Sequence, residues 1–553
     1  MLSGLVYLPS WKGEFLWDDI NALPASEIVQ DPSGWLKAWV APPRSHPDYF
    51  PLTTNTFWLE WRLFGENPFG YRVVNTLLHG LAAVALYSLL IQLGLPGAAW
   101  AAAIFALHPV NVESVAWISE RKNVLSMLFG ILSFAWFMRW QGNRSAGSYQ
   151  ASLLIFVAAL ASKASVVALP LVFLAFLWWR DRRLDRRDIR GVVPFVLTSL
   201  FFGLMVVHFQ HSRAVGQWDI EMPGWLSRIG GAGVVYWHYV FSTFWPVNLM
   251  TIYPRSLSDP AQAWQVALSL GTVICGSLAL FSKNIAVRTV GFAMVATALL
   301  LAPVLGFVKM SFMRYALVSD HLQQVALPVL ISSAICGVAA LVRDRKATNP
   351  MQRAWIGLPI AASLCLFVLS WHRAGLHASN EAMWRDSLAK NPNSSHAHNF
   401  LGSILAARKN FSDAERHFLE AARLDPGNPE PPTNYAFTLM DRGRDAEAIQ
   451  AFQKVVESGT PYAGAFLGLS EAYTKTLNMM KATEVLVDGA RRFPDSMTLN
   501  ASAAGSLLAA GNPSEALGFL EQCRRLDPDN RSLQTDIAET RRRADQVQGE
   551  GSP

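Results

Sequence analysis

Two adjacent carboxylates, Asp18 and Asp19, follow a tryptophan close to the start of the chain. A carboxylate within hydrogen-bond reach of a hydroxyl group can accept its proton while the oxygen attacks an electrophile, which typically accelerates the reaction by about 10² to 10⁴. The structural alternative is that one of the two caps a helix that begins after Ile20. The surrounding segment, residues 10–72, is long and rich in Trp, Pro and Tyr, and long ordered loops often carry function. This context favours a chemical role for the acid pair.

Metal and redox chemistry leave weaker signals in the sequence. No group of His, Cys and Asp has the spacing of a metal site. Asp18 and Asp19 could still hold Mg²⁺ or Mn²⁺ together with Glu113, so a divalent cation stays open and no other cofactor is expected. The four cysteines form no disulfide framework, because three lie inside apolar runs and one stands alone in the tail. They are Cys275, Cys336, Cys365 and Cys523.

The elements that position these residues are mostly membrane helices. Of the 553 residues 51% are apolar and 16% charged, and the mean hydropathy is positive, which indicates a protein that lies largely in a membrane. Apolar runs that can contribute to crossing a ~30 Å hydrocarbon core recur up to Trp371 and then stop. We predict an all-α, multi-spanning membrane domain at 1–372, a soluble domain at 373–545 and a disordered tail at 546–553. The predicted spans are 73–93, 98–108, 124–140, 151–162, 164–179, 192–209, 262–281, 287–307, 323–342 and 354–371.

The basic stretch RDRRLDRRDIR, from Arg180 to Arg190, sets the expected orientation. Short basic loops stay on the cytoplasmic side, so counting spans from this loop places the acid pair and the loop around Asp320 and His321 on the opposite face. The soluble domain shares that face if the aromatic stretch 234–248 is re-entrant or interfacial. We expect the periplasmic face of a bacterial inner membrane. No nucleic-acid partner is expected, because the excess positive charge is concentrated in this one loop.

The first ten residues, MLSGLVYLPS, are apolar but too few to cross a bilayer. They also lack the basic start and the small-residue cleavage site of a signal peptide. We therefore expect that a first span is missing from the chain or was lost through a misassigned start.

A 34-residue period organises the soluble domain. Small residues where two helices touch, a bulky residue one turn later and a proline before the next helix predict stacked helical hairpins. They resemble the tetratricopeptide repeat, with a partial copy at Trp384 and Pro392. Such arrays usually bind a peptide or a partner protein in a groove, and a purely structural cap is the alternative. The recurring residues are Ala414, Ala448, Ala482 and Ala516, then Phe418, Phe452, Leu486 and Leu520, then Pro426, Pro494 and Pro528, with Pro461 one place out of register.

Several motifs of the membrane domain follow one another in a fixed order: FLWDDINALPASEIV, NPFGYRVVNTLLHG, IFALHPVNVESVAWISERKNVLSMLFG, SKASVVALPLVFL, FWPVNLMTIYP and PVLGFVKMSFMRYALVSDH. With the repeats, this series resembles the transmembrane and tetratricopeptide-repeat proteins related to the protein O-mannosyltransferases, within the GT-C superfamily of integral-membrane glycosyltransferases. The resemblance implies transfer of a sugar from a polyprenyl- or dolichyl-phosphate donor to an acceptor on the non-cytoplasmic face, usually with inversion.

The same resemblance implies roles for individual residues. Its acidic motif falls on Asp18 and Asp19, one of which would be the general base, and Asp18 is favoured. A cation must meet the lipid phosphate that leaves as an anion. The residues implied for the donor phosphate and the pocket are Arg314, Asp320, His321, Lys163, His108 and Glu113.

Several of these residues also have a structural interpretation. Lys163 lies unpaired between two apolar runs, an expensive placement unless it serves a site. His108 could instead be a satisfied histidine at a helix end. Three further outer-face cations, which could also contact lipid headgroups, are Arg121, Lys122 and Arg255.

The sequence thus predicts a membrane glycosyltransferase that uses a polyprenyl-phosphate-linked sugar, with mannose or another hexose favoured. The acceptor could be Ser or Thr of a protein held by the repeats, which would raise its local concentration. The rival hypothesis is a non-catalytic membrane scaffold whose repeats recruit envelope proteins. A transporter is disfavoured, because the polar residues gather in external loops rather than at mid-membrane.

Overall fold

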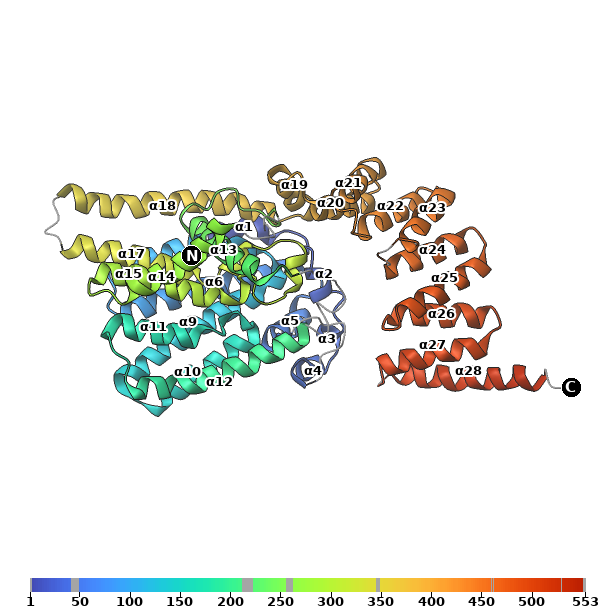
Figure 1. Cartoon of the computed structure of the whole chain (residues 1–553), viewed down its shortest axis with the longest axis horizontal. Helices are drawn as coiled ribbons and strands as arrows, with labels where there is room; N and C mark the ends of the chain where they lie inside the picture. The colour runs from blue at the N-terminus through green and yellow to red at the C-terminus, as the bar shows by residue number, and fades with distance from the viewer. Residues whose placement is uncertain are drawn as a thin grey trace. The chain divides into compact units, whose positions relative to one another are not determined.

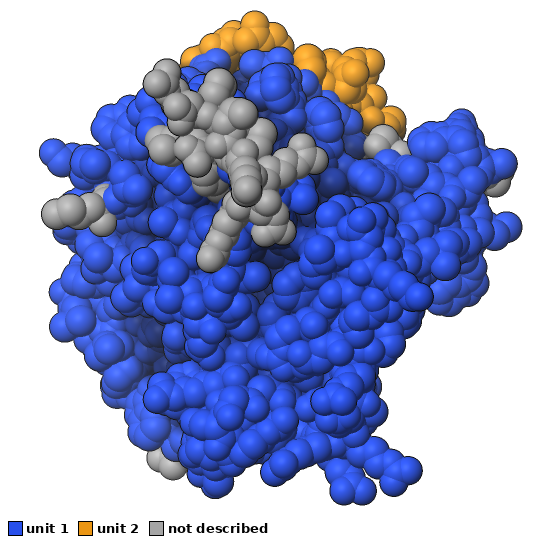
Figure 2. All heavy atoms as spheres, turned by 90° about the vertical axis from the view of Figure 1, so that its left-hand side faces the viewer, with its two compact units in different colours: residues 1–391 blue, residues 392–553 orange. Residues whose placement is uncertain are grey.

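The computed structural model gives the arrangement of most of the chain (Figure 1). Every element of the described residues is an α-helix or a 3-10 helix and none is a strand, which confirms the all-α prediction. Two compact units are present, Met1–Asn391 and Pro392–Pro553, which we call unit 1 and unit 2 (Figure 2). The described residues are 2–40, 49–210, 222–254, 262–344, 349–458, 460, 462–528 and 530–550.

Unit 1 contains the membrane helices. Among its described residues, seven helical segments are long and apolar enough to span a membrane and three further apolar helices are shorter. Every predicted span falls on one of these ten segments, and the chain is an integral membrane protein. The seven are α6 (Pro68–Gln92), η1 with α9 (Ile118–Glu120, Arg121–Asn143), η2 with α11 (Ala164–Val166, Leu169–Asp181), α12 (Arg186–Phe209), α14 (Ala263–Leu280), α15 with η4 (Ile285–Leu301, Ala302–Val304) and Gly357–Leu376 within α18 (Asn349–Leu376). The shorter three are α7 (Ala98–Leu107), α10 (Ala146–Ser162) and Leu327–Val342 within α17 (Leu327–Asp344).

The other helices of unit 1 lie before, between and after these ten segments. Most are short, because Gly and Pro punctuate these segments and no long apolar stripe favours a longer helix. They are α1 (Leu2–Trp11), α2 (Asp19–Ala22), α3 (Glu27–Gln30), α4 (Gly34–Val40), α5 (Pro51–Phe64), α8 (Asn111–Ala116), α13 (Trp225–Phe244), η5 (Ser311–Arg314), α16 (Asp320–Gln323) and α19 (Asn380–Lys390).

Side-chain contacts bring the same ends of several helices together. The hydroxyl of Thr53 in α5 donates to the carbonyl of Ser162, where α10 ends (3.0 Å). The hydroxyl of Ser370 in α18 donates to the carbonyl of Leu107, where α7 ends (2.7 Å). The carbonyl of Thr243, near the end of α13, accepts from the side chain of His108, which directly follows α7 (2.9 Å). We call this end of unit 1, which also carries α2 to α5, the loop end; in Figure 1 the last residues of α17 and the first of α18 lie at the other end.

The basic stretch 180–190 joins α11 to α12 away from the loop end. η2 and α11 start beside the end of α10 and together cover 18 residues, a helical length of about 27 Å at ~1.5 Å per residue. The predicted re-entrant stretch 234–248 corresponds to the second half of α13, which begins earlier, at Trp225. α13 is not among the seven candidate spans of the described residues.

Unit 2 is a series of paired helices. The alanines of the 34-residue period are buried at helix contacts, and Phe418 and Phe452 pack against Gly402 and Gly468, where a Cβ atom would meet the rings at 2.8 Å and 2.4 Å. This packing is that of the predicted helical hairpins. Its helices are α20 (Ser395–Ala407), α21 (Phe411–Leu424), α22 (Glu430–Asp441), α23 (Asp445–Val456), α24 (Ala463–Lys475), α25 (Met479–Arg492), α26 (Met497–Ala509), α27 (Pro513–Leu526) and α28 (Arg531–Glu550).

The compact units and the predicted domains divide the chain at different residues. By packing, unit 1 extends to Asn391, because the buried Trp384 of α19 contacts Trp17, whereas the predicted membrane domain ends at 372. The disordered tail predicted from 546 overlaps α28, which continues to Glu550. Pro461 and residues 551–553 lie outside the described residues.

Candidate active site

Asp19 anchors the acidic loop to the segment after α8. Its carboxylate accepts hydrogen bonds from the backbone N–H groups of Leu16 (2.9 Å) and Ser119 (2.7 Å), and its side chain is fully buried. Burial raises the pKa of Asp19 to about 6, against the lowering effects of these bonds and of Arg72. The Asp19 carboxylate is thus enclosed by the protein and joins the acidic loop to the segment after α8.

Asp18 is exposed. It precedes α2, but its side chain makes no capping hydrogen bond, so the helix-cap alternative does not describe it. Its neighbour Trp17 stacks on Trp117 with ring centroids 5.3 Å apart and 8° between the planes. Trp117 in turn meets the ring of His321 edge-on at 6.0 Å. Asp18 therefore lies between Trp17 and Asp19, two residues that contact other segments of the loop end.

Glu113 and His321, two of the predicted residues, are in direct contact. His321 Nδ1 lies 2.8 Å from Glu113 Oε1 and 2.7 Å from the hydroxyl oxygen of Ser319, which itself lies 3.1 Å from Glu113. A carboxylate can only accept, so these partners assign the proton of neutral His321 to Nδ1. The second ring nitrogen, Nε2, is then the one that can accept or carry a proton.

Asp320 is held by a residue that we did not predict. Arg373, near the end of α18, places Nη2 at 2.6 Å from Asp320 Oδ2 and at 3.7 Å from Glu113 Oε2. The Tyr253 hydroxyl donates to the other oxygen of Asp320 (2.8 Å). Burial raises the pKa of Asp320 to about 6, although Arg373 lowers it. Both oxygens of Asp320 are therefore engaged, and the residue has no exposed surface.

Lys163 is not the unpaired charge that the sequence predicts. Its Nζ lies 3.7 Å from Glu120 Oε2, and Lys122 Nζ lies 2.9 Å from Glu120 Oε1. Asn123 donates to the same carboxylate. Glu120 is buried, whereas both lysine side chains keep a small exposed fraction (14% and 18%). Two lysines on one carboxylate give this group of three residues a net positive charge.

Two predicted residues have structural surroundings. His108 Nε2 donates to the Thr243 carbonyl (2.9 Å) and Nδ1 accepts from the N–H of Val110 (3.3 Å), so the ring is a satisfied histidine at a helix end rather than an open pocket residue. Arg121 is fully buried and paired with Glu60 in α5. It therefore contacts neither a lipid headgroup nor a phosphate.

Arg314 and Arg255 are the remaining predicted cations. Arg314 lies at the end of η5, with its guanidinium 5.5 Å from the ring centre of Tyr315, which itself meets Trp17 at 5.3 Å. It is therefore close in the chain to the aromatic contacts of the acidic loop. Arg255 lies outside the described residues.

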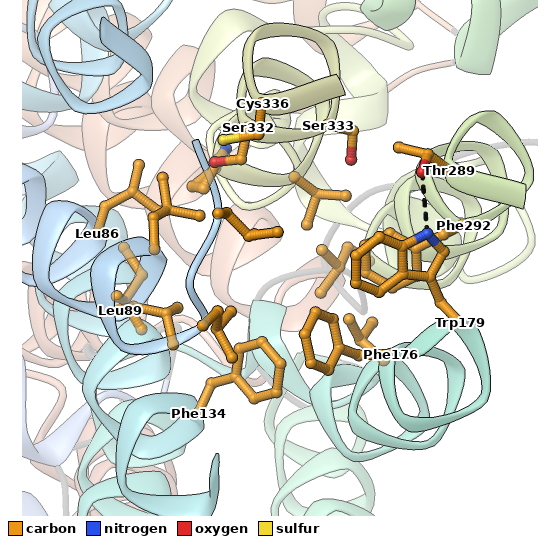
Figure 3. Close-up of a pocket in the computed structure, with 18 of the residues that line it drawn as sticks. Leu86, Leu89, Phe134, Phe176, Trp179, Thr289, Phe292, Ser332, Ser333 and Cys336 are labelled. Atoms are coloured by element: carbon orange, nitrogen blue, oxygen red, sulfur yellow. Dashed lines mark hydrogen bonds between the residues drawn. The ribbon is translucent and has the colours of Figure 1, made fainter. Parts of the chain in front are cut away.

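An apolar cavity of about 300 Å³ lies between α6, α9, α11, α15 and α17 (Figure 3). In Figure 3 aliphatic and aromatic side chains surround it, and the hydroxyl of Thr289 in its wall accepts from Trp179 Nε1 (3.0 Å). Its lining includes Val166, three residues after Lys163, and Val325, four residues after His321. The cavity thus reaches segments that also carry the loop-end cations. Leu86, Leu89, Phe134, Phe176 and Phe292 are among the labelled residues.

The described residues contain no group of three or more His, Cys, Asp or Glu side chains placed to hold a metal ion. The predicted set of Asp18, Asp19 and Glu113 is therefore not assembled as a metal site. Glu113 faces His321 and Arg373 instead.

Comparison with known proteins identifies relatives along most of the chain. A protein O-mannosyl-transferase of Caenorhabditis elegans is 23% identical over 77% of this chain and 62% of its own length. Human protein O-mannosyl-transferase TMTC3 is 22% identical over 97% of this chain and 65% of its own length. Residues 374–429 and 405–463 match sequence models of the tetratricopeptide repeat. The chain is thus similar to proteins named protein O-mannosyl-transferases, and it carries tetratricopeptide repeats.

The relationship to the O-mannosyl-transferases is clearest over short stretches. Protein O-mannosyl-transferase TMTC1 of Mus musculus is 35% identical, but over only 26% of this chain and 17% of its own length. The chain spans less than two thirds of the length of the first relatives that it matches. Among solved structures, MamA shares 18% identity over 28% of this chain and 91% of its own, with a TM-score of 0.24. YrrB, described as a TPR protein with an unusual peptide-binding site, shares 14% over 36% and 96%, with a TM-score of 0.23.

Three residues that hold charged groups at the loop end were not predicted from the sequence. Arg373 carried a usable signal, because a charged residue near the end of a membrane helix is expensive unless it is paired. Glu120 adjoins two cations, Arg121 and Lys122, and an ion pair could have been expected there. Tyr253 carried no signal, since its contact with Asp320 depends on the tertiary fold.

Proposed function

We propose that unit 1 is a GT-C-type glycosyltransferase, which moves mannose or another hexose from a polyprenyl-phosphate donor to an acceptor hydroxyl on the non-cytoplasmic face. The proposal rests on one observation, which is that three features lie at the same end of the helix bundle. They are the acidic loop with the exposed Asp18, the Glu113–His321 pair, and the two lysines that contact Glu120. The kinship with named protein O-mannosyl-transferases supports the same reaction class.

Asp18 is the proposed general base. The acceptor oxygen attacks C1 of the sugar, the bond between C1 and the phosphate oxygen breaks, and the hydroxyl proton passes to the Asp18 carboxylate. The polyprenyl phosphate leaves with the bonding electron pair. Asp18 suits this role because it is an exposed residue, whereas Asp19 is fully buried with its carboxylate accepting from two backbone donors.

The leaving phosphate is the proposed partner of the loop-end cations. His321 is oriented by Glu113 through Nδ1, so its imidazolium form, with a second proton on Nε2, would donate from Nε2 to a phosphate oxygen. Lys122 and Lys163 add positive charge, and Arg314 is the fourth candidate. Preorganised charge of this kind stabilises a developing anion because it needs no reorganisation during the reaction.

The apolar cavity supports a lipid-linked donor over a soluble nucleotide sugar. An isoprenoid chain is a pure hydrocarbon, and its burial is favourable by about 25 cal/mol for each Å² of apolar surface removed from water. The cavity wall between α6, α9, α11, α15 and α17 is almost wholly apolar, and it includes residues close in sequence to Lys163 and His321. A donor could therefore keep its chain among membrane helices while its phosphate meets the cations.

The repeats are the proposed binding site for a protein acceptor. α18 ends at the loop end and α19 continues within unit 1, so the chain leaves unit 1 on the face that carries Asp18. A Ser or Thr of a protein bound to the repeats would then meet the site at a raised effective concentration. We propose that the repeats and the active site both lie on the periplasmic face of a bacterial inner membrane.

The test of catalysis compares Asp18→Asn with wild type in nanodiscs that contain the full chain, radiolabelled polyprenyl-phosphate-mannose and Ser/Thr-rich peptides. We expect a loss of sugar transfer of about 10² to 10⁴, because Asn cannot accept the proton. Asp31→Asn is the matched control, since Asp31 lies in the same loop and contacts Ser33 and Lys37. If wild type consumes no hexose donor in a panel, the scaffold hypothesis replaces the enzyme. If wild type is active and Asp18→Asn is fully active, Asp18 is not the base.

The test of topology uses sealed inverted membrane vesicles, in which the cytoplasmic face points outwards. Protease should leave unit 2 intact while it reaches the basic connection 180–190. Opening the vesicles with detergent should then expose unit 2, which is the positive control. Digestion of unit 2 in sealed vesicles would place the repeats on the cytoplasmic face and contradict the proposal.

A further inference from the structure

Asn380, the first residue of α19, holds the acidic loop at three points. Its side-chain oxygen accepts from the backbone N–H of Trp17 (3.0 Å), and its side-chain nitrogen donates to the carbonyl of Phe15 (2.8 Å). Its backbone N–H and its side-chain amide both donate to Glu14 Oε1 (2.6 Å and 3.2 Å). The last of these anchored residues, Trp17, directly precedes Asp18.

Trp384, one turn further along α19, packs against the same residue. Its ring centroid lies 5.1 Å from that of Trp17 at an angle of 66°, and only 1% of Trp384 is exposed. Trp17 has a backbone φ of +34°, a value that L-residues with bulky side chains rarely adopt. Such a conformation persists only where the surroundings hold it. Here Trp117 and Trp384 pack against the indole ring while Asn380 holds the backbone.

The backbones of the two segments also touch. The N–H of Glu14 donates to the carbonyl of Ala378 (3.0 Å). A Cβ atom on Gly13 would lie 2.5 Å from the same carbonyl oxygen, so this approach requires glycine. The buried guanidinium of Arg72 donates to the carbonyls of both Glu14 and His377. The acidic loop and the start of α19 are therefore one interlocked structure.

We propose that α19 is a working part of the active site, in which Asn380 and Trp384 are positioning residues that hold Asp18 for the acceptor hydroxyl. This inference rests on the proposed function. The tetratricopeptide match at 374–429 includes α19, whereas the contacts of α19 place it in unit 1. One helix thus belongs to the repeat array by sequence and to the transferase site by packing.

This arrangement has a consequence that a simple tether would not have. A tether affects only acceptors that bind the repeats, because it acts through their local concentration. A positioning helix affects every acceptor, because it sets the place of the base, and a misplacement of about 1 Å can cost about 10²-fold in rate. A small soluble hydroxyl acceptor therefore separates the two roles.

The experiment uses the full chain in nanodiscs with a short Ser/Thr peptide as acceptor and compares Asn380→Ala and Trp384→Ala with two controls. Arg385→Ala changes an exposed residue of the same helix whose ion pair is with Glu381, and Trp384→Phe keeps an aromatic ring against Trp17. Initial rates give kcat and KM for donor and acceptor. Amide hydrogen exchange of residues 14–19, followed by mass spectrometry, reports the loop without any need for activity. The melting temperature shows whether each variant is folded.

We expect kcat to fall about 10- to 100-fold in Asn380→Ala and Trp384→Ala, with the donor KM unchanged and faster exchange of residues 14–19. Arg385→Ala should match wild type, and Trp384→Phe should recover most of the rate. If wild type is active and a folded Asn380→Ala variant has an unchanged kcat, the positioning role is wrong, while the proposed function stands. A wild type without turnover overturns the proposed function and with it the positioning role, while exchange still reports whether α19 holds the loop.

Discussion

The two units of this protein place their charges in opposite ways. Unit 1 buries charged residues at its loop end, where Asp320 meets Arg373 and Glu60 meets Arg121. Among the described residues of unit 2, the buried polar side chains include no Asp, Glu, Lys or Arg. Its ion pairs lie on the surface, many of them between residues three or four apart on one helix, such as Glu420 with Arg423.

The difference shows where chemistry can take place. Buried charges cost solvation free energy, and a fold keeps them only where partners compensate them. The surface pairs of unit 2 are screened by water and salt and contribute little to stability, so its helices are held by the apolar repeat positions instead. Unit 2 therefore has the properties of a binding surface, and unit 1 those of a site built to handle charge.

The largest expected effect comes from Arg373→Ala in unit 1. The substitution leaves Asp320 buried beside Glu113 without a cationic partner, and breaking a buried pair in this way typically costs about 3–5 kcal/mol. We therefore expect a large drop in the melting temperature of unit 1 and a loss of sugar transfer. Differential scanning calorimetry of the protein in detergent micelles measures the first, and the nanodisc assay measures the second.

The matched variant in unit 2 is Arg423→Ala. Arg423 forms the same type of carboxylate–guanidinium contact, at 2.6 Å from Glu420, but the pair is exposed. We expect no measurable change in melting temperature, because water replaces the lost contact. Equal effects of the two substitutions would show that burial does not distinguish the two units.

The repeats could be predicted from the sequence in detail because their helices obey a strict period. Ala448 and Phe452 are buried where the spacing places them, since each repeat contacts mainly its neighbours in the chain. Composition likewise indicated every membrane helix. The place of α19 could not be predicted, because Trp384 fits the repeat pattern and yet packs on Trp17, a residue more than 360 positions earlier in the chain.

The candidate site was predictable in its residue types but not in its pairing. Glu113 and His321 are 208 residues apart in sequence, and only the fold shows that they touch. Asp18 and Asp19 looked equivalent in the sequence, and their different burial separates them. Lys163 was expected to be unpaired because its partner Glu120 comes from a different helix.

A smaller and pH-dependent effect is expected from Asp19→Asn, which compares a buried carboxylate of unit 1 with the exposed Glu420 of unit 2. The pKa of Asp19 is raised by burial from 3.8 to about 6, whereas the pKa of Glu420 is lowered by its bond to Arg423. The folded state therefore binds the Asp19 proton more tightly than the unfolded state does. Its contribution to stability is fully present below pH 3.8 and is lost as the pH rises through about 6, a change of roughly 3 kcal/mol at most.

Glu420 acts with the opposite sign, because a lowered pKa adds stability above the unfolded value of 4.5 that is lost as the pH falls. Melting curves of wild type and Asp19→Asn between pH 4 and pH 7 isolate the Asp19 contribution, since the buried histidines are common to both proteins. Wild type should gain stability relative to Asp19→Asn as the pH falls. Relative to Glu420→Gln, wild type should show no such gain. A wild-type advantage that grows with rising pH would mean that the Asp19 carboxylate is stabilised in its charged form by Leu16, Ser119 and Arg72, and that the acidic loop is held by charge rather than by burial.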